Sequence, residues 1–245
     1  MKARKLRLDQ LLVDRGLAET RSKAQAIIMT GQVFVGERKL DKPGEAVADD
    51  IALQLRQSGP GWVSRGALKL IEGLDRFAID PVGATCLDVG ASTGGFTEVL
   101  LMRGAVRVYA VDVGYGQLAQ KLRDDPRVVN LERTNARHLT SSRVPEPIDL
   151  LVCDASFIGL STVLPSPMAL CRQGAHALVL IKPQFEVGPA RVGKGGVVRD
   201  LALHEEVCAR YRTWFAERGW SVHGIVPSPI TGPAGNVEFL LAASL

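Results

Sequence analysis

Apolar residues follow two different spacings along the chain, and the spacing changes near residue 60. In the first part, leucines three and four residues apart predict a helix that ends at Gly16. A second helix is expected to begin after Thr20, a residue type that caps helix N-termini, and to end at Gly31. Short alternating runs at 33–35 and 51–55 then predict strands. The first part of the chain is therefore expected to be a small α+β unit.

Beyond a turn-rich segment at 58–62 and a helix expected over 65–77, apolar strands alternate with helices. We expect the strands near 85–89, 106–111, 128–132, 149–153, 177–181, 221–226 and 237–242. This alternation, with continuously apolar strands, is typical of a parallel sheet covered on both faces. The last two strands leave no room for a helix between them, so we expect an antiparallel pair. The predicted fold class is α/β, with a seven-stranded sheet.

The domain organisation follows from the same patterns. We expect a small domain over 1–58, a linker over 59–63 and a large domain over 64–245. The chain is 46% hydrophobic and 23% charged, which is ordinary for a soluble globular protein. No apolar run reaches the roughly 18 residues needed to span a bilayer, and no apolar signal core follows the basic N-terminus. A cytoplasmic protein is therefore expected.

Positive charge is concentrated in the first quarter of the chain. Residues 1–58 contain 11 Lys/Arg and 8 Asp/Glu, which is a net charge of +3, and the whole chain has a net charge of +4. An anionic partner is therefore expected to bind the small domain.

The cysteines are far apart and include no C-x-x-C pair; they are Cys86, Cys153, Cys171 and Cys208. Cys86 and Cys153 lie in apolar, strand-like runs. We expect reduced thiols rather than disulfides or a metal site.

A glycine-rich turn marks a candidate ligand site. The segment LDVGASTGGFTEVLL (87–101) predicts a strand, a turn and a helix. Gly90, Gly94 and Gly95 allow the backbone to approach a ligand closely, and the helix start offers free N–H groups. The spacing matches neither G-x-G-x-x-G nor G-x-x-x-x-G-K-[ST], so the dehydrogenase and P-loop signatures are both absent.

Two acidic residues near the turn indicate which kind of ligand it binds. Asp88, which we place inside the turn, would repel a pyrophosphate but suits the ammonium of a methionine group. Asp112 is expected at the tip of the next strand, where a carboxylate can accept both hydroxyls of a ribose. Together they favour S-adenosylmethionine over a dinucleotide. The alternative is a tight turn that binds nothing.

Four charged residues stand where apolar residues are expected: Lys69, Asp154, Lys182 and Glu238. Asp154 and Lys182 end parallel strands, at the edge where open sheets bind ligands. Glu238 lies in an apolar strand that we expect to be antiparallel, so the start of this strand reaches the same edge. The alternative is that each residue is a strand-end charge in water.

Five motifs carry a resemblance to a known family: SRGALKL, LDVGASTGGF, VCDASF, LIKPQFE and GNVEFLLA. In combination they resemble the FtsJ-type ribose 2′-O-methyltransferases, and most closely the TlyA family, which is also labelled haemolysin A. Residues 7–40 resemble the alpha-L RNA-binding module that this family joins to its catalytic domain. The resemblance covers nearly the whole chain. It implies a Rossmann-like methyltransferase sheet behind a small RNA-binding domain.

The resemblance also implies an activity and its residues. The family uses S-adenosylmethionine to methylate a ribose 2′-hydroxyl of ribosomal RNA, and we expect a cytidine, within a ribosomal subunit, as the target. Its catalytic tetrad falls on Lys69, Asp154, Lys182 and Glu238. The cofactor contacts fall on Asp88, Gly90, Ser92, Gly94, Gly95, Phe96, Asp112, Val113, Asn135, Ala136 and Asp154. Ser92-Thr93 before the paired glycines departs from the usual FtsJ motif, in the segment expected to contact the methionine group. We expect a monomer without a membrane partner.

Basic residues are expected to hold the RNA: Arg4, Lys5, Arg7, Arg21, Lys23, Arg65, Arg191 and Lys194. The first five form one basic face in our interpretation, and the glycine-rich segment 186–200 is expected to be a mobile basic loop. The alternative for both is a solvated surface. Phe157 and Phe185 are either core residues or platforms for a flipped nucleotide.

The residue types leave two roles open for the lysines. A ribose hydroxyl must lose a proton, and Lys182, with Lys69 as a second cation, is the candidate base if its neutral form is populated. Alternatively, both lysines stabilise the developing alkoxide electrostatically.

Three other functions are considered. A membrane-active haemolysin is disfavoured because the chain shows no signal, spanning segment or long amphipathic helix. A non-catalytic RNA-binding assembly factor is disfavoured by the intact tetrad. Base methylation at carbon usually needs a cysteine nucleophile, and strand alternation points Cys153 away from the face of Asp154.

Overall fold

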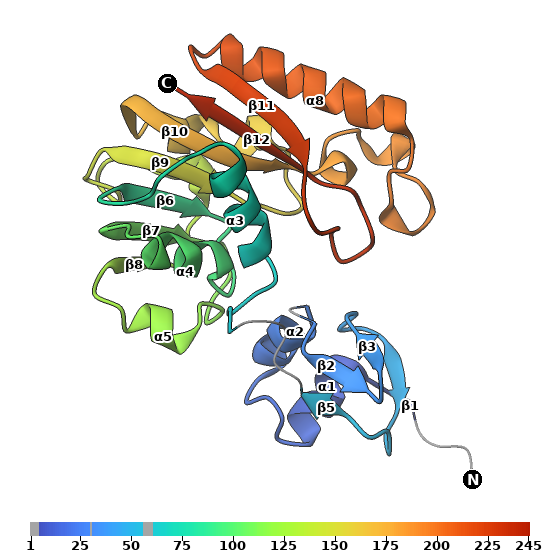
Figure 1. Cartoon of the computed structure of the whole chain (residues 1–245). Coiled ribbons are helices and arrows are strands. Elements are labelled where there is room, and N and C mark those ends of the chain that lie inside the picture. The colour runs from blue at the N-terminus through green and yellow to red at the C-terminus, as the bar shows by residue number, and fades with distance from the viewer. Residues whose placement is uncertain (1–4, 30, 56–60) are drawn as a thin grey trace. The chain divides into compact units, whose positions relative to one another are not determined.

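The computed structural model describes residues 5–29, 31–55 and 61–245 (Figure 1). The chain divides into two compact units, residues 1–65 and 66–245, and each is described here by itself. Of the linker expected at 59–63, residues 59 and 60 lie outside the described residues.

The described residues of the N-terminal unit form two helices and five short strands. Its elements are β1 (Lys5–Arg7), α1 (Leu8–Asp14), α2 (Arg21–Met29), β2 (Val33–Val35), β3 (Arg38–Leu40), β4 (Ala46–Ala48) and β5 (Gln54–Leu55). β1 pairs with β4, and β2 lies between β3 and β5 in an antiparallel sheet. The core is formed by apolar residues of both helices and of the strands, including Leu8, Leu12, Ile28, Val33 and Leu40.

Both helix boundaries expected in this unit are confirmed. The hydroxyl of Thr20 accepts a hydrogen bond from the Lys23 amide at 3.2 Å. Gly31 has a φ of +72°, in the left-handed region that favours glycine after a helix. The strand expected over 51–55 is shorter, because the Ile51 amide bonds back to the carbonyl of Ala48 in a turn.

The C-terminal unit is a seven-stranded sheet in the order β11-β12-β10-β9-β6-β7-β8 (Figure 1). The strands are β6 (Thr85–Val89), β7 (Arg107–Val111), β8 (Val128–Leu131), β9 (Ile148–Cys153), β10 (Cys171–Ile181), β11 (Ser221–Pro227) and β12 (Phe239–Ser244). The pairs among β10, β9, β6, β7 and β8 are parallel, and β12 runs antiparallel to both of its neighbours. The expected α/β class and the antiparallel final pair are therefore confirmed.

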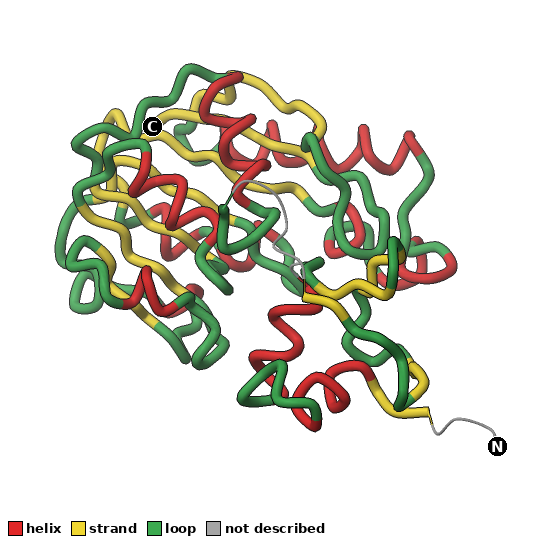
Figure 2. Tube along the Cα trace, turned by 60° about the horizontal axis from the view of Figure 1, so that its bottom comes forward, coloured by secondary structure: helices red, strands yellow, loops and turns green. Residues whose placement is uncertain are grey.

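Helices lie on both sides of the strands (Figure 2). They are α3 (Ala67–Arg76), α4 (Gly95–Met102), α5 (Gln120–Arg123), α6 (Leu160–Val163), α7 (Pro165–Met168) and α8 (Leu201–Ala216), with 3-10 turns η1 (Ala136–His138), η2 (Pro183–Phe185), η3 (Pro189–Arg191) and η4 (Lys194–Gly196). On one face α3 lies so close that a Cβ on Gly73 would be 2.6 Å from the Leu178 side chain. On the other, Tyr211 and Phe215 of α8 join the core with Val179 and Leu241.

Two positions in the sheet differ from expectation. Glu238 immediately precedes β12 and does not lie inside a strand, because pairing with β10 begins at Phe239 opposite Ile181. β10 begins at Cys171, well before the expected residue 177, because it is extended by a pairing with β9 that is interrupted by a bulge.

Two further observations bear on function. No helix in the described ranges is both long and apolar enough to cross a membrane. All four cysteines are free, and Cys86 and Cys153 are buried.

Candidate active site

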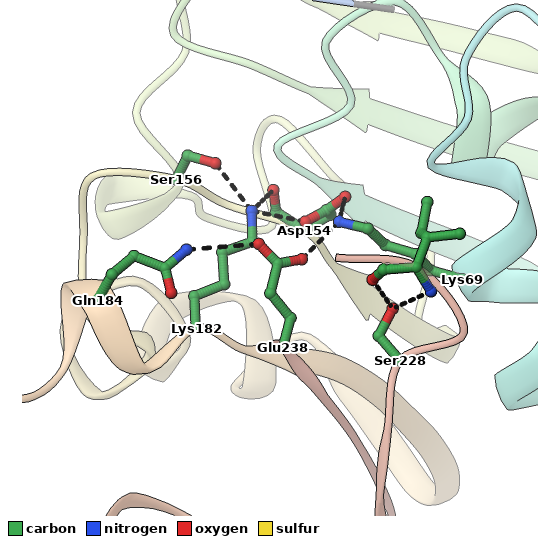
Figure 3. Close-up of polar contacts among 8 residues, drawn as sticks. Lys69, Asp154, Ser156, Lys182, Gln184, Ser228 and Glu238 are labelled. Atoms are coloured by element: carbon green, nitrogen blue, oxygen red, sulfur yellow. Dashed lines mark hydrogen bonds and ion pairs between the residues drawn. The ribbon is translucent and has the colours of Figure 1, made fainter. Parts of the chain in front are cut away.

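The four charged residues predicted as a tetrad meet at one edge of the sheet (Figure 3). Asp154 follows β9 and Lys182 follows β10, so both leave the sheet at the carboxyl ends of parallel strands. Glu238 stands just before the antiparallel β12 and so reaches the same edge. Lys69 comes from the first turn of α3, the helix that packs on this part of the sheet.

A continuous chain of ion pairs joins the tetrad. Lys69 Nζ lies 2.7 Å from Glu238 Oε2 and 3.3 Å from Asp154 Oδ2. Lys182 Nζ lies 2.6 Å from Asp154 Oδ1. It also donates to the Asp154 carbonyl at 3.1 Å and to the Ser156 hydroxyl at 2.8 Å. The carboxylate of Asp154 therefore bridges the two ammonium groups.

The charges in this cluster are set by burial and by the neighbours. Burial disfavours the Lys69 ammonium, but Asp154 and Glu238 outweigh it and raise the pKa of Lys69 above its ordinary value. Burial likewise disfavours the Asp154 carboxylate, but Lys182 and Lys69 outweigh it and lower its pKa. At neutral pH Lys69 is therefore a cation and Asp154 an anion. A raised pKa makes Lys69 unsuitable as the general base.

The Glu238 carboxylate is held by its own neighbours. Gln184 Nε2 lies 3.4 Å from Glu238 Oε1, on the side away from Lys69. A Cβ on Gly232 would be 2.6 Å from the same oxygen, so only glycine leaves room for it. Asn236 accepts a hydrogen bond from the Val198 amide and donates to the Gly196 carbonyl, both at 2.9 Å. These contacts connect the turn before β12 to the glycine-rich loop at 186–200.

Ser156, Gln184, Gly232 and Asn236 are contributors that sequence reasoning missed. Ser156 and Gln184 stand inside the VCDASF and LIKPQFE motifs, so their proximity to predicted site residues was the available signal. The contacts of Gly232 and Asn236 arise from the fold of the turn at 228–238, and no motif in the sequence indicates them.

The glycine turn lies directly against the tetrad. A Cβ on Gly90 would be 2.9 Å from the Ala155 Cα, so the turn approaches the segment behind Asp154 as closely as a glycine allows. Gly90 and Gly94 have φ values of +83° and +99°. α4 begins at Gly95, and its first N–H groups follow the turn.

Asp88 is placed differently from expectation. It lies within β6, not inside the turn, because the strand continues to Val89 before the chain bends. Its side chain is buried, and Oδ2 accepts a hydrogen bond from the Thr97 hydroxyl at 2.7 Å. Oδ1 has no hydrogen-bond partner among the described residues. Burial raises the pKa of Asp88 to about 7, although the bond from Thr97 opposes the shift.

Asp112 follows β7, as expected from the sequence. Its two oxygens accept hydrogen bonds from the amides of Ser92 at 2.8 Å and Gly114 at 2.7 Å. Each oxygen keeps a further acceptor position for a ribose hydroxyl. Since Asp112 orders the glycine turn through Ser92, it joins two of the predicted cofactor segments.

The other predicted cofactor residues have varied surroundings. Val113 is 71% exposed, whereas Phe96 is buried. The Asn135 side chain accepts a hydrogen bond from the Arg137 amide and caps η1, while Ala136 packs into the core. The structure therefore brings Gly90–Gly95 and Asp112 together, and leaves Asn135 with a local capping contact.

The predicted RNA-binding residues are spread over both units. Arg4 lies outside the described residues. Lys5 and Lys194 are exposed, Lys23 pairs with Glu19, and Arg65 is half-buried. Arg191 forms two hydrogen bonds to Glu206, at 2.7 and 2.9 Å. Arg7 and Arg21 both contact Asp9.

Phe157, Phe185 and Cys153 were also considered as site residues from the sequence. Phe157 is 91% exposed, and its ring centroid lies 5.1 Å from that of Phe185. Phe157 is therefore not a core residue. Cys153 is fully buried, and burial raises its pKa to about 12, so it is not available as a thiolate nucleophile.

Known protein families match both parts of the chain. A family model for FtsJ-like methyltransferases matches residues 62–245, and one for the S4 domain matches residues 6–49. The chain is 51% identical to the 16S/23S rRNA (cytidine-2′-O)-methyltransferase TlyA of Mycobacterium tuberculosis, over 98% of the chain and 90% of that protein. It is 38% identical to Hemolysin A of Brachyspira hyodysenteriae, over 96% and 98%. A solved structure described as a hemolysin from Streptococcus thermophilus matches with a TM-score of 0.76 and 40% identity, over 98% and 88%.

Proposed function

The chain belongs to the FtsJ-like methyltransferase family and carries an S4 domain, and from this membership we propose that it methylates the ribose 2′-hydroxyl of a cytidine in ribosomal RNA. The observation that carries the proposal is the ion-paired chain of Lys69, Asp154, Lys182 and Glu238 beside the glycine turn. It places two lysines and two carboxylates beside the candidate cofactor site, where a hydroxyl must be oriented and deprotonated.

The residues of the turn fit S-adenosylmethionine, the methyl donor of this family. The unpartnered, buried Oδ1 of Asp88 would accept the ammonium of the methionine group. Asp112 would accept the ribose hydroxyls, and the backbone of Gly90–Gly95 would lie along the ligand. Bound S-adenosylmethionine supplies a methyl group that its sulfonium already activates.

The protein's own part in the reaction is to orient the hydroxyl and to manage its proton. Asp154 fixes both lysines, and Glu238 holds Lys69 from the other side. We assign Lys182 to the 2′-oxygen, either as the base that takes its proton or as the cation that stabilises its developing charge. Lys69 stays protonated and supplies a second positive charge. Holding the two reactants in line contributes a further large part of the rate.

We place the reaction in the cytoplasm, on ribosomal RNA within a ribosomal subunit, by a monomer. The N-terminal part of the chain, which contains the S4 domain, would dock the RNA, because residues 1–58 carry a net charge of +3 out of +4. The names of the relatives support this substrate class.

The test is methyl transfer from labelled S-adenosylmethionine to purified ribosomal subunits and to deproteinised ribosomal RNA. Nuclease digestion and mass spectrometry of the product should locate the label on a ribose, on a cytidine. A label on a base, or no transfer to either substrate, would overturn the proposal. The Asp154→Asn protein, which keeps the shape of the side chain and loses its charge, is the matched control and should show almost no transfer.

A haemolytic activity is the second candidate, because two of the similar proteins carry that name. The described residues contain no helix that could span a membrane. Leakage of dye from liposomes by the pure protein would support it, and intact liposomes would remove it.

A further inference from the structure

A buried carboxylate lies beneath the basic residues of the N-terminal unit. Asp9, in the first turn of α1, is fully buried. Its oxygens accept hydrogen bonds from Arg7 Nε at 3.0 Å and Nη2 at 2.9 Å, and from Arg21 Nε at 3.0 Å. Gln25 Nε2 at 3.0 Å and the Gln10 amide at 2.9 Å complete the set.

These contacts leave one side of each arginine open. Asp9 takes the Nε edge of both guanidinium groups, and both side chains are 52% exposed. Within the described part of the chain, no hydrogen bond engages Nη1 of Arg7 or either Nη of Arg21. The free N–H groups of a fixed guanidinium suit the oxygens of a phosphodiester.

The Asp9 carboxylate stays ionised although it is buried. Hydrogen bonds from Arg7 lower the pKa of Asp9 well below its ordinary range and outweigh the effect of burial. Asp9 therefore reduces the positive charge of this surface at every pH at which the protein would meet RNA. By its charge alone, Asp9 would weaken RNA binding at this surface. Any favourable contribution of Asp9 must therefore come from how it positions the two arginines.

We propose that Asp9 is a positioning residue for RNA binding, which fixes the guanidinium groups of Arg7 and Arg21 side by side so that they engage phosphates of the RNA backbone. The inference rests on the proposed function, since it takes RNA as the ligand. Free arginine side chains would have to be ordered on binding, and that ordering costs affinity. Fixing them beforehand through one buried carboxylate removes this cost.

The sign of one effect tests the proposal. Asp9→Asn removes a negative charge, so charge alone predicts tighter RNA binding. Positioning predicts the opposite: freeing two long side chains should weaken the affinity of the full-length protein for purified ribosomal RNA roughly tenfold. Asp14→Asn is the matched control, because it removes the same charge from an exposed residue of the same helix. It should bind as tightly as the unchanged protein or slightly more tightly.

A second measurement separates positioning from loss of the fold. In a protein that carries Arg7→Gln and Arg21→Gln, Asp9 has no arginine left to position. Adding Asp9→Asn there should no longer weaken RNA binding, whereas a damaged fold would weaken it as before. The inference is overturned if Asp9→Asn binds ribosomal RNA as tightly as Asp14→Asn, or if its effect persists without the arginines. If the unchanged protein binds but does not methylate ribosomal RNA, the proposed function fails and the inference about binding stands.

Discussion

At the scale of single residues, Lys182 Nζ forms an ion pair with the Asp154 carboxylate and donates hydrogen bonds to the Asp154 carbonyl and the Ser156 hydroxyl. Lys182→Ala should lower kcat by the roughly 10²–10⁴-fold that a lost general base costs. The affinity for S-adenosylmethionine should change little, because the glycine turn is untouched. Single-turnover kinetics and calorimetry on the same protein would measure both effects.

Lys182→Arg separates the two roles of this residue. Arginine keeps a positive charge but does not lose its proton in the working range. Substantial activity in this variant would identify Lys182 as an electrostatic stabiliser, and activity as low as in Lys182→Ala would identify it as the base. Near-normal turnover by Lys182→Ala would contradict the tetrad assignment as a whole.

Asp88 provides a prediction on pH. Its pKa of about 7 in the folded protein lies above the unfolded value near 4, so the folded state holds a proton that the unfolded state releases. Stability of the cofactor-free protein should therefore fall as the pH rises from about 4 through 7, by as much as roughly 4 kcal/mol. Binding of S-adenosylmethionine should strengthen over the same range, because the carboxylate must be ionised to hold an ammonium.

Asp88→Asn should flatten both profiles, since an amide does not titrate. Denaturant unfolding and calorimetry at pH 5 and pH 8 would show this. Equal slopes in the variant and the unchanged protein would assign the pH dependence to another group.

Single residues also mark how far sequence reasoning reaches. Three members of the tetrad could be predicted because charged residues adjoin apolar runs where strands begin or end, and Lys69 because it stands between apolar residues of a helix. The topology then joins them. The strand expected over 85–89 already contains Asp88, so placing this residue inside the turn was wrong. Its contact with Thr97 could not be predicted, because it depends on how α4 lies against β6.

At the scale of elements, the Glu186 carboxylate connects three segments of the C-terminal unit. Its carboxylate accepts hydrogen bonds from the Leu160 amide at 2.9 Å, the Tyr211 hydroxyl at 2.5 Å and Arg210 Nη2 at 3.1 Å. It thereby joins the segment after β10 to the start of α6 and to α8.

Removal of the Glu186 carboxylate should break the contacts that connect the segment after β10 with α6 and α8, and so lower the stability of the protein. Glu186→Ala leaves the buried Tyr211 hydroxyl without an acceptor, which costs about 1–3 kcal/mol and lowers Tm by several degrees in a thermal melt. Glu205→Ala, on an exposed position of α8, is the matched control and should leave Tm unchanged. A Glu186→Ala protein as stable as this control would show that these contacts do not stabilise the protein.

Element prediction succeeded where the apolar pattern is long. Strands such as β10 and β12 are predictable because each carries a long apolar run, whereas β1, β3 and β4 have three residues each and show no period. Their pairing is set by the turns that connect them and by the core beneath, including Leu40 and Val47. Such strands exist through tertiary packing more than through local sequence.

At the scale of the whole molecule, each unit has its own core. A protein limited to residues 66–245 should therefore fold and bind S-adenosylmethionine with the affinity of the full chain. It should lose at least tenfold in affinity for ribosomal RNA, because the RNA-binding domain and the net positive charge of residues 1–65 are gone. Calorimetry and a filter-binding assay at two salt concentrations would test both parts. Undiminished methylation of ribosomal RNA by this fragment would show that the S4 domain does not dock the substrate.

The antiparallel insertion of β12 between β10 and β11 has a consequence for the timing of activity. The glycine turn, Asp112 and Asp154 are all made well before Glu238 during synthesis, which proceeds from the N-terminus. Until β12 docks, β10 lacks its antiparallel partner, and Lys69 lacks the carboxylate that lies 169 positions later in the chain. With the roles proposed above, a nascent or clipped chain would contain the cofactor residues without a complete tetrad. Methyl transfer would then be reserved for molecules in which the final strand has docked.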